Sequence, residues 1–112
     1  IGYLAMVGGM TRVDRDVPPF CLAEGHPGRI RGLNNVGIKR KNIDKDNKEE
    51  YLQLKRIWNL LFKSEYVISD GLKMARKENL LQSSARLCEF LERSIARGRR
   101  GPMPYLMSNN KS

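Results

Sequence analysis

The chain has 112 residues, of which 40% are hydrophobic, and its formal net charge is +9. This length allows one ordinary domain or a piece of a larger one. No apolar stretch approaches the roughly 20 residues that a membrane helix needs, so we expect no integral membrane segment. The chain opens without an initiator methionine or a basic secretory n-region, which favours a fragment of a longer protein.

Positive charge is concentrated beyond the first third of the chain. Residues 1–36 hold four arginines and three acidic residues, so +8 of the net +9 lies after them. Such a basic region suits nucleic acid, an anionic membrane, a phosphorylated ligand or an acidic protein partner. Charge alone does not choose among them.

The two cysteines, Cys21 and Cys88, lie far apart and match no metal-ligand spacing. Because no secretion signal is visible, we expect reduced, unreactive, partly buried thiols rather than a disulfide or a nucleophile. We also expect a cytoplasmic location, no bound metal and no other cofactor.

The first residues place an aliphatic side chain at every sixth position: Ile1, Val7 and Val13, the first two followed by glycine. This spacing is typical of hexapeptide β-helix repeats, in which each aliphatic side chain points into a triangular coil. An ordinary strand-and-turn pair with chance spacing fits as well. If the β-helix interpretation holds, further coils or another chain must cover this end, because one coil cannot bury its own interior.

A joint between two kinds of pattern runs from Asp16 to Lys41. Pro18 and Pro19 lack backbone donors and end the repeat. Short strands are expected over residues 20–23 and 29–32, with a turn over residues 24–28 between them.

Amphipathic helices are predicted after the joint. The first follows a possible capping box of Asp46 and Glu49 and runs to about Lys63. Its apolar stripe, which we expect to be core, consists of Tyr51, Leu54, Ile57, Trp58, Leu61 and Phe62.

Two more helices follow. Ser69 and Asp70 can cap a short second helix, and Ser83 or Ser84 can open a third that ends at Gly98 or Gly101. If the β-helix interpretation holds, the chain is α+β with three parts: residues 1–36 as a terminal β-helix coil and closing strands, residues 37–101 as a helical domain, and residues 102–112 as a flexible tail.

The segments IGYLAMVGG, DVPPF and GLNNVGIKRK resemble the end of the acyl-[acyl-carrier-protein]:UDP-N-acetylglucosamine O-acyltransferases of lipid A synthesis. The segments LKRIWNLLFKS and LERSIARGRRG stand where that family has its first and last C-terminal helices. GLN followed by GIKR is the discriminating part, since DVPP and the six-residue spacing occur across many hexapeptide transferases.

The resemblance implies a left-handed parallel β-helix followed by a small helical domain, in a homotrimer with active sites between subunits. The reaction moves a 3-hydroxyacyl group from acyl carrier protein to the 3-hydroxyl of UDP-N-acetylglucosamine, with a β-helix histidine as general base. The single histidine here, His26, does not match that base. We therefore expect this chain to lack the catalytic histidine and to be inactive alone.

Binding residues carry over from the resemblance. Asn34 matches an asparagine that contacts the nucleotide-sugar, and Arg40 matches an arginine at the UDP phosphates, where a planar guanidinium binds two oxygens. Lys41 stands where many relatives have a second arginine. Gly9 and Met10 lie where the family measures acyl-chain length, although no length is predicted.

The basic helical surface has a possible use of its own. Acyl carrier proteins are acidic, so Lys55 and Arg56 could attract and orient the carrier protein. Competing interpretations are a basic helical nucleic-acid-binding module, supported by the RGRR cluster, and a non-catalytic assembly module. Against nucleic acid, the first helix mixes Glu49 and Glu50 with its basic residues and no nucleic-acid motif is present.

Overall fold

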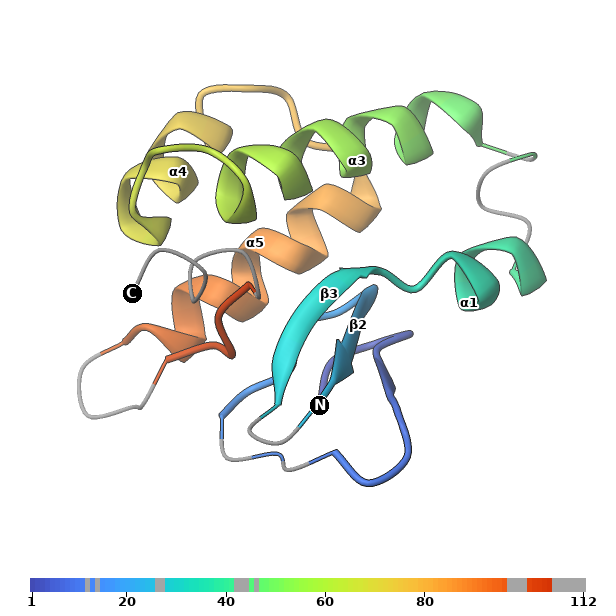
Figure 1. Cartoon of the computed structure of the whole chain (residues 1–112). Coiled ribbons are helices and arrows are strands. Elements are labelled where there is room, and N and C mark those ends of the chain that lie inside the picture. Colours follow the sequence, from blue (N-terminus) through green and yellow to red (C-terminus); the bar gives the residue numbers. More distant parts are fainter. Residues whose placement is uncertain are drawn as a thin grey trace.

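The computed structural model describes residues 1–11, 13, 15–25, 28–41, 45, 47–96 and 101–105 (Figure 1). One small sheet lies beside a layer of helices, so the chain is α+β as predicted. The strands are β1 (Met6–Val7), β2 (Cys21–Glu24) and β3 (Arg29–Leu33). The helices are α1 (Asn35–Arg40), α3 (Lys48–Phe62), α4 (Ile68–Ala75) and α5 (Gln82–Ser94).

The sheet joins segments from both sides of the proline pair, in the order β1-β2-β3. β1 pairs with β2 in parallel, with Met6 opposite Leu22. β2 and β3 form an antiparallel hairpin with an irregularity between Leu22 and Ala23. Both hairpin strands were predicted; the middle of their turn, His26 and Pro27, lies outside the described residues.

Helix α3 follows the predicted stripe. Its buried side chains recur at three- and four-residue steps, which places them on one face. The predicted cap, Asp46, lies outside the described residues, and Asn47 at the N-cap position makes no side-chain hydrogen bond to the helix. The helix ends at Phe62, one residue before the expected end.

The predicted starts of the next two helices are wrong in detail. Helix α4 begins at Ile68 after Val67, so Ser69 and Asp70 lie inside its first turn. Helix α5 begins at Gln82 after Leu81, and neither preceding residue caps through its side chain. Instead, Oε1 of Glu50 on α3 accepts hydrogen bonds from the Ser83 backbone N–H (3.0 Å) and hydroxyl (2.7 Å). A carboxylate from another helix therefore caps α5, favoured by the helix dipole.

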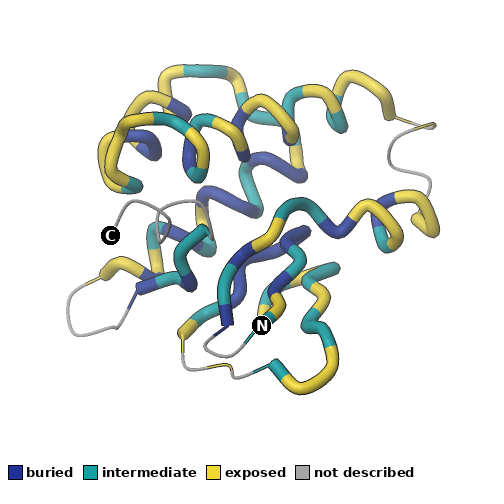
Figure 2. Tube along the Cα trace, in the orientation of Figure 1, coloured by how far each residue is buried: buried dark blue, intermediate teal, exposed yellow. Residues whose placement is uncertain are grey.

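The core lies between the sheet and the helices (Figure 2). Buried hydrophobic residues from both halves of the chain form one cluster. They are Val17, Phe20, Cys21, Ala23, Ile30, Ile38, Leu54, Ile57, Trp58, Leu61, Leu72, Ala75, Leu87, Cys88, Leu91 and Met103.

The end of the described chain packs against this core. Met103 is fully buried, and its N–H donates to the Asp16 carbonyl oxygen at 2.8 Å. The Tyr105 ring stands edge-on to Trp58, with centroids 5.5 Å apart. We expected a flexible tail from residue 102, whereas in the structure apolar side chains of residues 102–105 pack against the core; residues 106–112 lie outside the described part.

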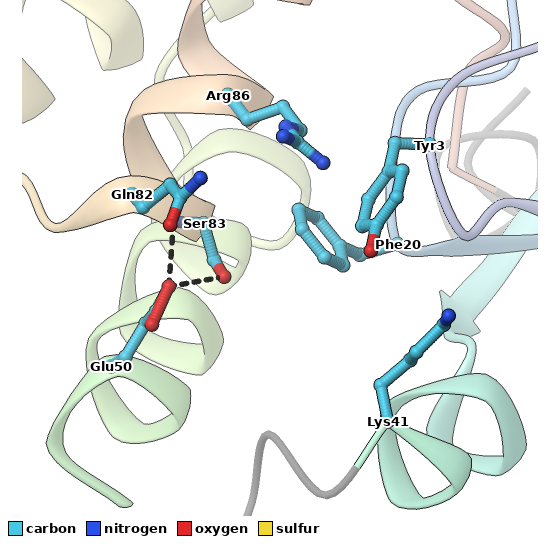
Figure 3. Close-up of a pocket in the computed structure, with 7 residues that line it drawn as sticks. All are labelled: Tyr3, Phe20, Lys41, Glu50, Gln82, Ser83 and Arg86. Atoms are coloured by element: carbon cyan, nitrogen blue, oxygen red, sulfur yellow. Dashed lines mark hydrogen bonds between the residues drawn. The ribbon is translucent and has the colours of Figure 1, made fainter. Parts of the chain in front are cut away.

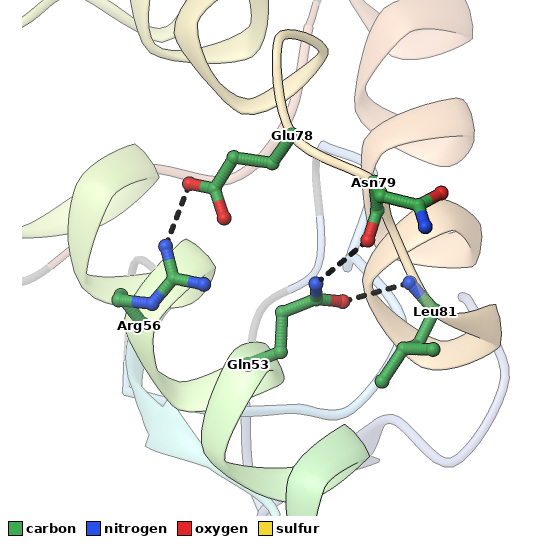
Figure 4. A network of polar contacts seen from close by, with 5 residues as sticks. All are labelled: Gln53, Arg56, Glu78, Asn79 and Leu81. Carbon is green, nitrogen blue, oxygen red and sulfur yellow. Dashed lines mark hydrogen bonds and ion pairs between the residues drawn. The ribbon is translucent and has the colours of Figure 1, made fainter.

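Polar contacts fasten the α4–α5 connection to α3 (Figure 4). The Gln53 amide donates to the Asn79 carbonyl oxygen at 3.1 Å and accepts from the Leu81 N–H at 2.8 Å. Arg56 pairs with Glu78 at 2.6 Å and so lowers the pKa of that carboxyl group. Within the described parts of the chain, every helix is too short or too polar to cross a lipid bilayer.

Apolar side chains remain open to solvent along the first segment and α1. Of the six-residue series, Val7 is partly buried, but Ile1 is 75% exposed and Val13 is 42% exposed. Tyr3, Met6, Met10 and Val36 are also exposed. The described chain thus covers its helical core well and its first segment poorly.

Candidate functional site

The predicted binding residues lie around one groove, of about 350 Å³. Asn34, Arg40 and Lys41 contribute from α1 and its two flanking residues. The opposite wall is the segment Leu4–Met6, and the groove is also lined by Val36 and Gly37. The groove therefore combines an apolar wall with two cationic side chains.

Asn34 connects the two walls. It is only 7% exposed, and its Nδ2 donates to the Leu4 carbonyl oxygen at 2.8 Å. Its Oδ1 accepts from the Gly37 N–H at 3.2 Å, which caps α1. Both ends of the amide are thus bonded within the chain, so Asn34 shapes the groove whether or not it also touches a ligand.

The position of the Asn34 amide accounts for the glycine at residue 37. A Cβ added at Gly37 would lie 2.5 Å from Nδ2 of Asn34, closer than real Cβ contacts allow. The asparagine amide occupies the space that any side chain would need. The GLN and GIKR parts of the motif are therefore coupled by a direct contact.

Arg40 and Lys41 end α1. Both are exposed, and among the residues described neither forms an ion pair with a carboxylate. Cations are favoured at a helix C-terminus by the helix dipole. Their uncompensated charge suits an anion, and Arg40 can present two parallel N–H donors to it.

The residues expected to measure acyl-chain length stand apart from this groove. A Cβ added at Gly9 would meet nothing within 4 Å. Met10 is 96% exposed, with a φ of 61°. Neither residue lines the groove, so any measurement of chain length would need a surface that the described residues do not supply.

The two expected docking residues differ in their surroundings. Arg56 is paired with Glu78, whereas Lys55 lies 5.6 Å from the centroid of the Tyr51 ring. Lys55 borders a second groove, of about 280 Å³, between β3 and α3, which also contains Arg31 and Lys63. Arg31 was not predicted from the sequence, because a basic residue on a short strand carries no sign of what packs beside it.

The described thiols and acids show neither a group that could hold a metal ion nor a thiol with a lowered pKa. Burial raises the pKa of Cys21 to about 12, against a smaller opposing effect of the Trp58 indole, and raises that of Cys88 to about 11. Both cysteines are free, and they are fully buried rather than partly buried as expected. Across the described residues, no cluster of three or more His, Cys, Asp or Glu side chains could hold a metal ion.

Comparison with known proteins identifies the family. The family described as "Udp N-acetylglucosamine O-acyltransferase; Domain 2" matches residues 16–103. A relative from Gloeothece citriformis is 40% identical over 105 residues, and one from Synechocystis is 39% identical over 110 residues. Both are named acyl-[acyl-carrier-protein]–UDP-N-acetylglucosamine O-acyltransferase; each alignment covers 93% of this chain and 37% of the relative.

Solved structures of proteins with the same family name resemble this chain. A UDP-N-acetylglucosamine acyltransferase from Campylobacter jejuni superposes with a TM-score of 0.76 at 30% identity, over 93% of this chain and 38% of that one. The Arabidopsis enzyme superposes with a TM-score of 0.80 at 25% identity, over 91% and 37%. The chain thus spans little more than a third of the length of these proteins, and it belongs to the UDP-N-acetylglucosamine O-acyltransferase family.

Proposed function

We propose that the chain is the C-terminal part of an O-acyltransferase that moves a 3-hydroxyacyl group from acyl carrier protein to the 3-hydroxyl of UDP-N-acetylglucosamine, the first step of lipid A biosynthesis. Its relatives are named for the carrier protein and the nucleotide-sugar. One observation carries the assignment of this segment. Asn34, Arg40 and Lys41, chosen from the sequence, lie around one groove.

In this proposal the groove binds the nucleotide-sugar. Arg40 binds phosphate oxygens through its guanidinium fork, and Lys41 adds a point charge without that geometry. The segment Leu4–Met6 supplies an apolar wall, and Asn34 fixes its distance from α1. The general base belongs to coils outside this chain, so the segment binds substrate without catalysing the reaction.

The open apolar face supports the proposed assembly. The parallel pairing of β1 and β2 suits the last coil of a left-handed hexapeptide β-helix. Ile1, Met6 and Val36 are exposed on the segment and helix that border the groove. Further coils and the neighbouring subunits of a homotrimer would cover such a surface. We propose in addition that the protein is located in the cytoplasm.

Carrier-protein docking is the second role that we propose for this segment. Arg56 is compensated by Glu78, so the attraction is assigned to the groove of Arg31, Lys55 and Lys63. Charge reversal by Lys55→Glu should raise KM for the acyl-carrier substrate several-fold and leave KM for the nucleotide-sugar unchanged. An unchanged KM for the carrier substrate would remove Lys55 from the docking surface.

A chimera tests the function as a whole. The matching segment of the Gloeothece citriformis relative is replaced by this chain, and acyl transfer to UDP-N-acetylglucosamine is measured. We expect activity in a trimer, and we expect Arg40→Gln to raise KM for the nucleotide-sugar by about tenfold or more, the loss of one charged hydrogen-bonded contact.

The matched control is Lys39→Gln, which removes a neighbouring exposed charge that does not line the groove. A folded, trimeric but inactive chimera would count against the proposal. Binding of DNA or RNA by the chain with a steep salt dependence would favour the nucleic-acid module instead.

A further inference from the structure

A further cavity, of about 240 Å³, is also lined by Lys41 (Figure 3). Its walls come from segments far apart in the sequence: the first residues, the residue before β2, the end of α1 and the starts of α3 and α5. The lining residues are Tyr3, Phe20, Lys41, Glu50, Gln82, Ser83 and Arg86.

Arg86 is held in place by a ring. Its guanidinium carbon lies 4.0 Å from the centroid of Tyr3, and the Tyr3 ring stands edge-on to Phe20 at 5.8 Å. Stacking on an aromatic face leaves the N–H edge of a guanidinium open to a ligand. Among the described residues, no carboxylate pairs with Arg86. The side chain is thus oriented but not neutralised.

Among the described residues, one carboxylate lines the cavity, and it is already engaged. Glu50 accepts both Ser83 hydrogen bonds at the start of α5, so it is directed at that helix end (Figure 3). Lys41, on the opposite wall, also has no carboxylate partner among the residues described. In the part of the chain that the structure describes, the cavity is thus lined by two cations, and the carboxylate beside them is bonded to the start of α5.

We propose that this cavity is a phosphoryl-binding subsite, in which Arg86 contributes a two-pronged contact and Lys41 a point charge. Lys41 lines both this cavity and the proposed nucleotide-sugar groove. The diphosphate of the nucleotide-sugar is therefore the phosphoryl source that the geometry favours. This inference rests on the proposed function and adds Arg86, on α5, to its binding residues.

Titration calorimetry of the 112-residue chain tests the subsite with UDP-N-acetylglucosamine, UDP, uridine and inorganic phosphate. We expect Arg86→Gln to weaken UDP and UDP-N-acetylglucosamine binding by about tenfold or more and to leave uridine binding unchanged. Arg86→Lys keeps the charge and loses the two-pronged guanidinium contact, so its affinity for UDP should lie between those of the unmodified chain and Arg86→Gln. The matched control, Arg93→Gln, removes an exposed arginine on the same helix outside the cavity and should change nothing.

The outcomes separate the two proposals. If Arg86→Gln binds UDP as the unmodified chain does, while Arg40→Gln does not, the subsite is overturned and the groove stands. If Arg86→Gln weakens UDP binding and Arg40→Gln does not, the subsite stands and the groove assignment fails. If inorganic phosphate competes with UDP, the result supports the assignment of the subsite to the diphosphate of the nucleotide-sugar. If inorganic phosphate binds only when Arg86 is present but does not compete with UDP, the assignment to the nucleotide-sugar is overturned.

Discussion

The amide of Asn34 donates a hydrogen bond of 2.8 Å to the carbonyl oxygen of Leu4, thirty residues earlier. Leu4 has a φ of 54°, which is uncommon for a residue with a side chain, and this bond helps to hold its carbonyl in place. The same amide caps α1 through Gly37. One side chain thus sets the position of Arg40 and Lys41 relative to the first segment.

Asn34→Ala should destabilise the chain. The change removes both hydrogen bonds and leaves the Leu4 carbonyl and the Gly37 N–H without these partners, at a cost of about 1–3 kcal/mol in free energy of unfolding. Urea unfolding measures it. Asn35→Ala is the control, because Asn35 is exposed and only accepts a long 3.5 Å contact from the Tyr51 hydroxyl. Equal stability of the two variants would contradict the role given to Asn34.

Gly37→Ala should destabilise as well, although alanine favours an ordinary helix over glycine by about 1 kcal/mol. The new Cβ would overlap Nδ2 of Asn34, and overpacking costs about 1–3 kcal/mol. Unfolding midpoints of Gly37→Ala, Asn34→Ala and the double variant give the coupling. The double variant should be more stable than the sum of the single effects predicts. Gly32→Ala is the control, since a Cβ there meets nothing within 4 Å.

Met103→Ala should cost about 2–5 kcal/mol, the usual loss for a buried methionine. Met103 is fully buried, while Met10, the control, is 96% exposed and its replacement by alanine should cost almost nothing. Thermal unfolding followed by circular dichroism compares the two. If Met103→Ala left the midpoint unchanged, residues 102–105 would be the flexible tail that the sequence suggested.

The two thiols should react slowly in the folded chain. Folding raises the pKa of Cys21 to about 12 and that of Cys88 to about 11, from an ordinary value of 9.0, because burial disfavours the thiolate. Their contribution to stability is therefore complete below pH 9 and declines above it, where the unfolded chain loses its thiol protons first. Labelling with iodoacetamide at pH 8, with and without urea, measures the protection. Equal rates in both conditions would show that the thiols are accessible.

The pair between Arg76 and Glu92 should contribute a small, pH-dependent stability. Arg76 donates two hydrogen bonds to the carboxylate, at 2.9 and 2.6 Å, and so lowers the pKa of Glu92. Stability from a lowered pKa is present above the unfolded value and is lost as the pH falls through the folded one. Because both side chains are about 40% exposed, a double-mutant cycle should give only ~0.2–1 kcal/mol at pH 7, and less at pH 3.

Periodicity predicted most of the helical layer. The stripe from Leu54 to Leu61 identified α3, and apolar runs on either side of a turn identified the hairpin strands. Helix starts were predicted less well, because local capping rules see only neighbouring residues. The acceptor at the start of α5 is Glu50, 33 residues before Ser83.

In the candidate site, too, local sequence predicted some features, whereas contacts between distant segments were not predicted. The motif placed Asn34, Arg40 and Lys41 in one short segment, but their partners, Leu4 and the cavity wall at Arg86, come from distant segments. The sequence offered Arg56 as a cation for docking, but in the structure its guanidinium lies 2.6 Å from the Glu78 carboxylate. Ion pairs between segments leave no periodic trace in a sequence.

By itself, the sequence determined the helical stripe through its spacing, and its motifs showed a resemblance to the family, which in turn pointed to Asn34, Arg40 and Lys41. Only the tertiary structure decided that Asn34 is bonded at both ends, that residues 102–105 close the core, and that Arg86 and Lys41 line the same cavity. Each of these depends on which distant segments meet when apolar surface is buried, and that is a property of the whole chain.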